Sequence, residues 1–120
     1  MKIAIPAEKK DLNSPVCLSF GRAPFYLIYD TSSDSHEFVD NEAMKAQGGA
    51  GIKAAQQLVN EKVLFVITFR AGENAAQVLQ AGNIKIYKAL EKSLIENVQA
   101  LKENKLEELT EIHAGFHHVE

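Results

Sequence analysis

A cluster of glycines at the start of a predicted helix holds the most distinctive chemistry in this chain. Gly48, Gly49 and Gly51 occupy three of four consecutive positions and precede Ile52–Asn60, a run typical of a helix. Glycine inside a helix costs about 1 kcal/mol relative to alanine, so such a cluster favours a backbone that a ligand approaches closely. The first N–H groups of a helix lack internal partners and carry partial positive charge. The segment predicts an anion seat, with tight packing of helix against sheet as the alternative.

A loop before the second predicted strand carries a thiol and a guanidinium. Cys17 is the single cysteine, and a thiolate is a natural ligand for iron–sulfur clusters. The alternative is a small hydrophobe buried under the loop. One thiol cannot hold a four-thiolate cluster, so any cluster arrives preassembled or is shared between subunits. Arg22 suits an oxyanion, unless it pairs with Asp30 or Glu42 to fix the loop.

Three of the four histidines lie near the C-terminal end, at His113, His117 and His118. Imidazole binds iron, zinc and nickel, so the group is a candidate metal site. Histidine-containing tails often coordinate nothing in particular, and we expect weak or incidental metal binding. The predicted organisation is one domain over residues 1–112, followed by a flexible tail over residues 113–120.

The motifs of nucleotide binding and catalysis are missing from the sequence. The glycines are not followed by Gly-Lys-Ser/Thr, and their spacing does not match the dinucleotide fingerprint. No nucleophile elbow, carboxylate pair or oxyanion hole stands at a recognisable spacing. The predicted strands Lys2–Ala7, Val63–Phe69 and Ile84–Tyr87 contain no acid, which argues against a two-metal nuclease. These patterns argue against an enzyme.

Composition restricts the class of protein further. At 120 residues the chain is long enough for one domain with a real core. Its 13 basic and 16 acidic residues give a net charge of −3 without a basic block, which argues against nucleic-acid binding. No apolar run approaches a membrane span, and the N-terminal residues do not form a signal peptide. We expect a cytoplasmic protein without disulfides.

The N-terminal half of the chain predicts three strands. Lys2–Ala7 is a short buried strand, and Phe25–Tyr29 is apolar on both faces, as an interior strand is. The turn-forming run after it lets His36–Val39 pair back as the second arm of a hairpin.

The remainder predicts three helices and two parallel strands. Lys62–Phe69 and Ile84–Tyr87 flank a helix over Gly72–Gln80, and a right-handed crossover of this length makes the two strands parallel. Ser93–Glu96 is a capping box that begins the third helix. The first helix is expected to bury Ile52, Ala55, Leu58 and Val59. The order predicts a single-domain α/β fold with a mixed sheet.

Four segments make the chain similar to the dinitrogenase iron–molybdenum cofactor biosynthesis family, which includes NifX- and NifB-type cofactor-binding domains and small stand-alone members. The segments are Met1–Pro6, Phe20–Tyr26, Asn41–Leu58 and Val63–Tyr87. Many members have a histidine before the Phe-Gly-Arg motif, where this chain has Ser19. The resemblance implies a ribonuclease-H-like motif with a five-stranded sheet flanked by helices. It also implies that the protein binds or carries an iron–sulfur or iron–molybdenum cluster.

The expected site is a cleft between the loop Cys17–Arg22 and the helix start Gly48–Gly51. Cys17 would bind metal, Arg22 and the backbone N–H groups would neutralise the anion, and the tail histidines would close over it. The expected partners are metal-cluster assembly proteins, with the chain itself a monomer or weak homodimer. Two alternatives stay open: an interaction module of such a system without a cofactor, and a small-anion sensor that uses only Arg22 and the glycine turn.

Overall fold

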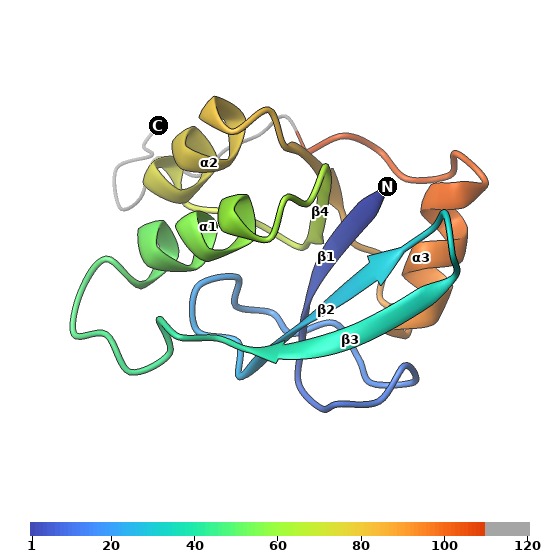
Figure 1. Ribbon diagram of the computed structural model, residues 1–120, viewed down its shortest axis with the longest axis horizontal. Helices are drawn as coiled ribbons and strands as arrows, with labels where there is room; N and C mark the ends of the chain where they lie inside the picture. Colours follow the sequence, from blue (N-terminus) through green and yellow to red (C-terminus); the bar gives the residue numbers. More distant parts are fainter. Residues whose placement is uncertain (110–120) are drawn as a thin grey trace.

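A mixed five-stranded sheet with helices on both faces organises the chain (Figure 1). The computed structural model describes residues 1–109. The strands are β1 (Lys2–Ala7), β2 (Phe25–Asp30), β3 (Ser35–Asp40), β4 (Phe65–Thr68) and β5 (Lys85–Lys88), in the order β3-β2-β1-β4-β5. The helices are α1 (Ala50–Asn60), α2 (Glu73–Ala81) and α3 (Leu94–Lys102). The predicted α/β class with a mixed sheet is confirmed, and the ribonuclease-H-like motif stays a prediction.

The antiparallel half of the sheet consists of β1, β2 and β3. Tyr26 and Ile28 of β2 face the core cluster under α1 and α2, whereas Leu27 and Tyr29 face the cluster under α3. Because both faces are covered, the strand is apolar throughout rather than alternating. The prediction of an interior strand at Phe25–Tyr29 is confirmed, as is the hairpin to β3.

The parallel half joins β1, β4 and β5. Val66 pairs with Ala4 on one side and with Ile86 on the other, and α2 forms the crossover from β4 to β5. The predicted strand–helix–strand unit is therefore confirmed. The strand β4 is shorter than the predicted segment, since regular pairing begins only at Phe65.

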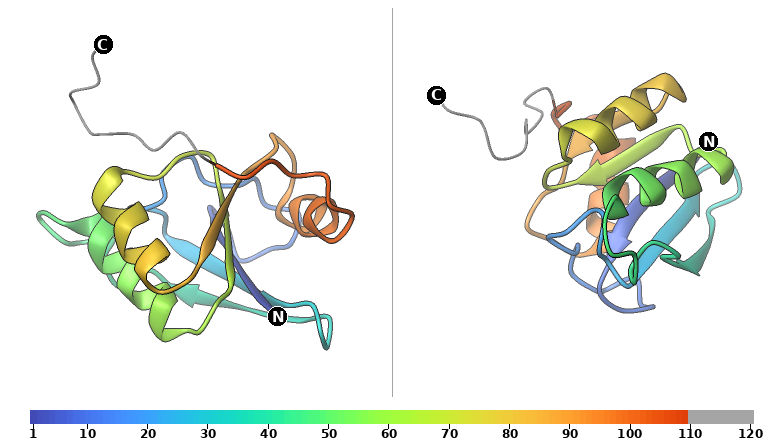
Figure 2. Two further views of the ribbon diagram at one scale, coloured as in Figure 1. Left: turned by 90° about the horizontal axis from the view of Figure 1, so that it is seen from above. Right: turned by 90° about the vertical axis from the view of Figure 1, so that its left-hand side faces the viewer.

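The helices form two layers, with α1 and α2 on one face of the sheet and α3 on the other (Figure 2). The buried stripe predicted for α1 is wrong at Ile52, which is 42% exposed. The reason is that α1 packs on α2 through small residues, which turns Ile52 toward the solvent. The residues of α1 that are buried are Ala50, Ala54, Ala55 and Leu58.

The helix α3 begins with the predicted capping box. The Glu96 N–H donates to Ser93 Oγ at 3.2 Å, and the Ser93 N–H donates to Glu96 Oε1 at 3.0 Å. The hydrogen bond from the Ser93 N–H lowers the pKa of the Glu96 carboxyl. The start of α3 is thus closed by its own side chains.

The last described residues run along the outer edge of β5. The Lys88 N–H donates to the Glu107 carbonyl and the Leu109 N–H to the Ile86 carbonyl, each at 2.8 Å. This antiparallel pairing covers an edge strand that would otherwise expose its hydrogen-bonding groups. Within residues 1–109, no helix has the length and apolar character needed to cross a membrane.

Candidate functional site

Two helices begin at the same edge of the sheet. Because β1 and β4 are parallel and β3 lies two antiparallel steps from β1, all three strands end at this edge. The helix α1 follows β3, and α2 follows β4. In sheets of this kind ligands bind beyond the carboxyl ends of the strands, so this edge is the first place to look for a site.

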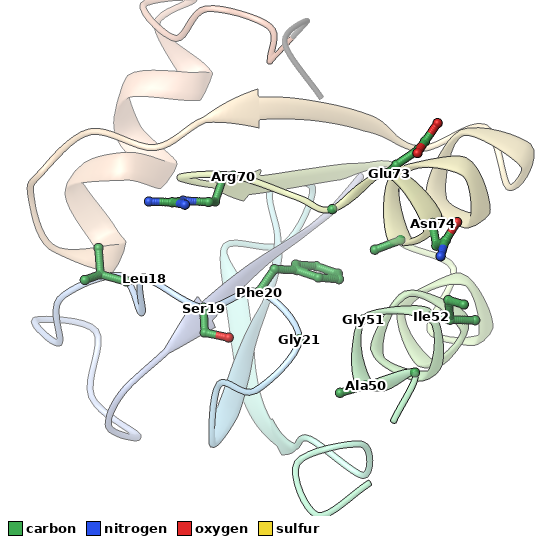
Figure 3. A pocket seen from close by; sticks show the side chains of 13 residues that line it. Leu18, Ser19, Phe20, Gly21, Ala50, Gly51, Ile52, Arg70, Glu73 and Asn74 are labelled. Atoms are coloured by element: carbon green, nitrogen blue, oxygen red, sulfur yellow. The ribbon is translucent and has the colours of Figure 1, made fainter. Parts of the chain in front are cut away.

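A cleft of about 620 Å³ lies at this edge (Figure 3). One side is the loop wall, residues 18–21, and another is the helix wall, residues 49–52 at the start of α1. The third side is the segment that leads from β4 into α2. It contributes Arg70, Gly72, Glu73, Asn74 and Ala75. The cleft therefore joins three segments that are far apart in the sequence.

The loop wall and the helix wall touch at two glycines. A Cβ atom added to Gly21 would lie 3.0 Å from both the N and the Cα atoms of Gly51. This distance is shorter than most contacts of real Cβ atoms, and a backbone cannot move aside like a flexible side chain, so the contact favours glycine at position 21. The two segments that the sequence predicts to form one site are in direct contact.

The starts of α1 and α2 lie next to each other because their contact residues are small. A Cβ on Gly51 would lie 3.3 Å from the Cβ of Ala75, so the helices approach closely at their first turns. Gly49 is the N-cap of α1 with φ 68°, a left-handed conformation that favours glycine. Gly48 is not among the lining residues, and a side chain there would meet nothing within 4 Å.

The first N–H groups of both helices are left without partners in the described part of the chain. Neither N-cap, Gly49 or Gly72, supplies a side-chain acceptor. No hydrogen bond to any of residues 1–109 is made by the N–H groups of Ala50, Gly51, Ile52, Glu73, Asn74 and Ala75. The positive ends of two helix dipoles therefore meet at one cleft.

The charged side chains of the cleft are separated from each other. Arg70 is exposed and forms no ion pair with a described residue. In Figure 3 its guanidinium extends toward Leu18, whereas the Glu73 carboxylate lies at the opposite end of the cleft. Leu18, which is 71% exposed, and Ile52 add apolar surface at the rim. The cleft thus offers amide donors and a cation beside apolar side chains, with one carboxylate at the far end from the cation.

Cys17 does not line this cleft, although the next residue, Leu18, does. The thiol is half-buried and packs against the core cluster under α1 and α2, and the Cys17 N–H donates to the Pro6 carbonyl at 2.9 Å. Burial and, second, the neighbouring Cys17 raise the pKa of the Tyr26 phenol. The structure therefore places Cys17 against the core and outside the cleft lining, and its role as a metal ligand stays a prediction.

Arg22 also lies outside the lining of the cleft. Its Nη1 donates to the Met44 carbonyl at 3.1 Å, and its N–H donates to Ser19 Oγ at 2.9 Å. Neither Asp30 nor Glu42 pairs with it in the described chain. Arg22 therefore fixes the loop, as the alternative supposed, but through a carbonyl and not through an acid.

The predicted tail histidines, His113, His117 and His118, lie outside the described residues. Within residues 1–109, no three His, Cys, Asp or Glu side chains are grouped so that they could hold a metal ion. The last described segment runs antiparallel to β5, and so leads away from the edge that bears the cleft.

The contribution of Arg70 and the start of α2 was missed at the level of sequence. The signal was present, because a buried strand followed by Gly72 and a helix is the arrangement that places backbone N–H groups at a ligand. The glycine cluster before α1 predicted a site at only one of the two helix starts.

Comparison with known proteins shows a consistent set of relatives. The apo form of the orange protein from Desulfovibrio gigas is 32% identical, covers 91% of this chain and 92% of its own, and has a TM-score of 0.87. A Thermotoga protein provisionally named NifB, of the DUF35 family, is 38% identical over 95% of this chain and 97% of its own, with a TM-score of 0.82. A Methanocaldococcus jannaschii protein provisionally named a dinitrogenase shares the fold, with 21% identity, coverage of 92% and 95%, and a TM-score of 0.69.

No functionally curated protein matches the sequence. The model of the family described as "Dinitrogenase iron-molybdenum cofactor" matches residues 1–104, which is nearly all of the described chain. The chain belongs to the dinitrogenase iron–molybdenum cofactor family.

Proposed function

We propose that this protein binds and carries an anionic metal–sulfur cluster, of the iron–sulfur or iron–molybdenum type, or a precursor of one. The observation that carries the proposal is the meeting of two uncapped helix starts and Arg70 at one cleft. Membership of the family supports a role in handling such a cofactor. The protein acts without catalysing a reaction, in the cytoplasm, and delivers its cargo to metal-cluster assembly proteins.

The physical basis is neutralisation of a compact anion by fixed dipoles. Unpaired N–H groups at helix starts and a guanidinium stabilise negative charge without a proton or a covalent bond. A cleft of about 620 Å³ has the size of an ordinary small-ligand site. Binding by amides and one cation is also exchangeable, as a carrier requires, because hydrogen bonds and charge attraction are broken more readily than covalent bonds.

Each predicted site residue has a part in this proposal. Gly49 and Gly51 give the anion access to the α1 amides, and Gly48 adds no side chain next to them. Arg22 acts indirectly, since it joins the loop wall to the Met44 carbonyl. Cys17 is the proposed metal ligand if the loop around it moves, and the tail histidines are the proposed second source of metal ligands.

Anaerobic loading followed by absorption spectroscopy tests the function. The probes are isolated iron–molybdenum cofactor and, separately, iron with sulfide, each against a protein-free blank. The proposal expects uptake close to one cluster per chain with the isolated cofactor. No uptake beyond the blank would contradict it, and would leave an interaction module without a cofactor.

The variant Cys17→Ala distinguishes a site in which the thiol binds the metal from one in which only the amides hold the cargo. Loss of uptake in this variant would assign a metal bond to the thiol, whereas unchanged uptake would assign the cargo to the amides alone. The small-anion sensor is the second candidate, favoured by the position of Cys17 outside the cleft lining. It predicts thermal stabilisation by carboxylate ligands that is the same in Cys17→Ala.

A further inference from the structure

A buried asparagine connects the loop wall to the turn that precedes the helix wall. Asn41 is 6% exposed, and its Nδ2 donates to the Gly21 carbonyl at 2.9 Å and to the Ala23 carbonyl at 2.8 Å. Its Oδ1 accepts from the Ala43 N–H at 2.9 Å. Every hydrogen-bonding position of this side chain except one acceptor lone pair is therefore used.

The same turn is joined to α1 by a second amide side chain. Gln57 Nε2 donates to the Asp40 carbonyl at 2.7 Å, and Gln57 Oε1 accepts from the Glu42 N–H at 3.0 Å. The residues on both sides of Asn41 are thus hydrogen-bonded to the helix. A continuous path leads from Gly21 through Asn41 and Gln57 to α1.

This path is important because the loop wall and the helix wall are in direct contact, with no gap between them. Gly21 packs directly on the Gly51 backbone, so a small movement of either wall changes the contact. Next to this contact are the N–H groups of Ala50, Gly51 and Ile52, which have no hydrogen-bond partner among residues 1–109. The position of the loop wall therefore decides how the α1 amides face a ligand.

We infer that Asn41 is a positioning residue, which sets the spacing between the loop wall and the α1 amides and thereby the affinity for the anionic cargo. The inference rests on the proposed function, because it concerns the same cleft. Asn41 does not line the cleft and touches no cargo; it acts through the Gly21 carbonyl.

The molecule contains a matched control for this residue. Asn97 of α3 is fully buried, and its Nδ2 donates to the carbonyls of Leu90, Lys92 and Ser93 at 2.9 to 3.3 Å. Its Oδ1 accepts from the Leu90 N–H at 2.8 Å. The chemistry is the same, but α3 packs on the face of the sheet opposite to α1 and α2.

The main variant is Asn41→Asp, compared with Asn97→Asp. An aspartate at position 41 keeps the acceptor for the Ala43 N–H but places a carboxylate against two carbonyls, which raises its pKa. We expect binding of isolated iron–molybdenum cofactor to weaken about tenfold at pH 8, the equivalent of about 1.4 kcal/mol. Affinity relative to wild type should recover as the pH falls, because the protonated group donates again. A role in packing alone produces no such pH profile.

A second variant, Gln57→Ala, interrupts the path at its other end on a half-buried position, so the protein should fold. Both hydrogen bonds of Gln57 are lost, but those of Asn41 to the loop wall remain, so we expect a weakening of only about threefold. In the ligand-free protein, the NMR amide signals of residues 19–22 and 50–52 should shift together in both variants. Asn97→Asp should lower stability while leaving these signals and the affinity unchanged.

The possible outcomes separate the inference from the proposed function. If wild type takes up the cofactor and both Asn41→Asp and Gln57→Ala bind as tightly, the inference is wrong and the function stands. If Asn97→Asp weakens binding as much as Asn41→Asp, the effect is one of global stability and the inference is also wrong. If Asn41→Asp does not fold, Gln57→Ala decides. Failure of wild type to bind overturns the function, and the affinity claim with it.

Discussion

The starts of α1 and α2 differ from the start of α3 in how their first N–H groups are satisfied. At α3, the N–H groups of Leu94 and Ile95 donate to the Ser14 and Leu12 carbonyls, each at 3.0 Å, and Ser93 caps Glu96. At α1 and α2 the N-caps are glycines without side-chain acceptors. The helix start on one face of the sheet is therefore closed by protein groups, whereas the two starts on the other face have no partners among residues 1–109.

The glycine N-caps of α1 and α2 are positions where the chain gives up stability. A side-chain cap contributes about 1 kcal/mol relative to alanine but only about a few tenths of a kcal/mol relative to glycine, so each glycine N-cap is a small loss of stability. The unpaired N–H groups can offset this loss only if a bound ligand accepts their hydrogen bonds. The loss occurs twice in the same cleft, as is expected of a site for an anion.

The largest effect is expected from Gly21→Ala, which breaks the contact between the two walls. The new Cβ would lie 3.0 Å from the Gly51 backbone, which cannot move aside like a flexible side chain. Stability should fall by about 2 kcal/mol, and cofactor uptake should be lost. Urea unfolding and loading measure the two effects.

The control for this change is Gly72→Ala, where a Cβ meets nothing within 4 Å and no positive φ is imposed. Its stability should fall by less than about 1 kcal/mol, since alanine is a poorer N-cap than glycine but meets no clash. Equal destabilisation by both variants would show that the contact between Gly21 and Gly51 has no special importance.

The next effect comes from giving α2 the cap that α3 already has. In Gly72→Asp the side chain can accept from the first N–H groups of α2, since Gly72 has the extended backbone of an N-cap. We expect stability to rise by about 0.5 kcal/mol while cofactor affinity falls about tenfold. Thermal unfolding and a binding titration measure the two quantities.

Gly72→Ser separates the cap from the charge, and should lower the affinity by a smaller factor. Conversely, Ser93→Ala should cost about 1 kcal/mol of stability and leave the affinity unchanged. A Gly72→Asp variant that binds as tightly as wild type would contradict the role of the α2 amides.

A smaller effect is expected from Arg70→Gln. Because Arg70 is exposed and has no ion-pair partner among residues 1–109, its removal should change stability by less than about 0.5 kcal/mol. Affinity should fall about fivefold at low salt and less at high salt, since salt screens exposed charges. Titrations at two ionic strengths test this. Lys92→Gln, a change of charge away from the cleft lining, is the control.

The smallest effect is a pH dependence that arises below the loop wall. The Tyr26 hydroxyl donates to the Phe20 carbonyl, and burial raises its pKa above the ordinary value. Below about pH 10 the phenol is neutral in both the folded and the unfolded state, and stability is unaffected. Above that pH only the unfolded state loses its proton, so stability falls. Urea unfolding between pH 8 and about pH 11 should show a shallower decline in Tyr26→Phe.

The fold was largely predictable from local patterns. The apolar run Phe25–Tyr29, the unit from β4 to β5 and the capping box at Ser93 each depend on neighbouring residues alone. The exposure of Ile52 could not be predicted in this way, because it depends on how closely α1 packs against α2. That distance is set by Gly51 and Ala75, which belong to different helices.

The site was predictable only in part. The sequence indicated that the loop bearing Gly21 and the glycine turn would form one site, and they touch. It did not indicate that Arg22 would donate to a carbonyl while Arg70 lines the cleft. Side-chain direction depends on tertiary contacts, and a single sequence identifies which residue types are present without their orientation.

The most direct test of the central claim is an amide NMR titration of isotope-labelled protein with isolated iron–molybdenum cofactor under anaerobic conditions. If the two free helix starts hold the anion, the signals of residues 50–52 and 73–75 should shift or broaden together in one saturable step. The signals of residues 94–96, at the capped start of α3, should stay unchanged. Saturable binding that leaves residues 50–52 and 73–75 unaffected would contradict the account.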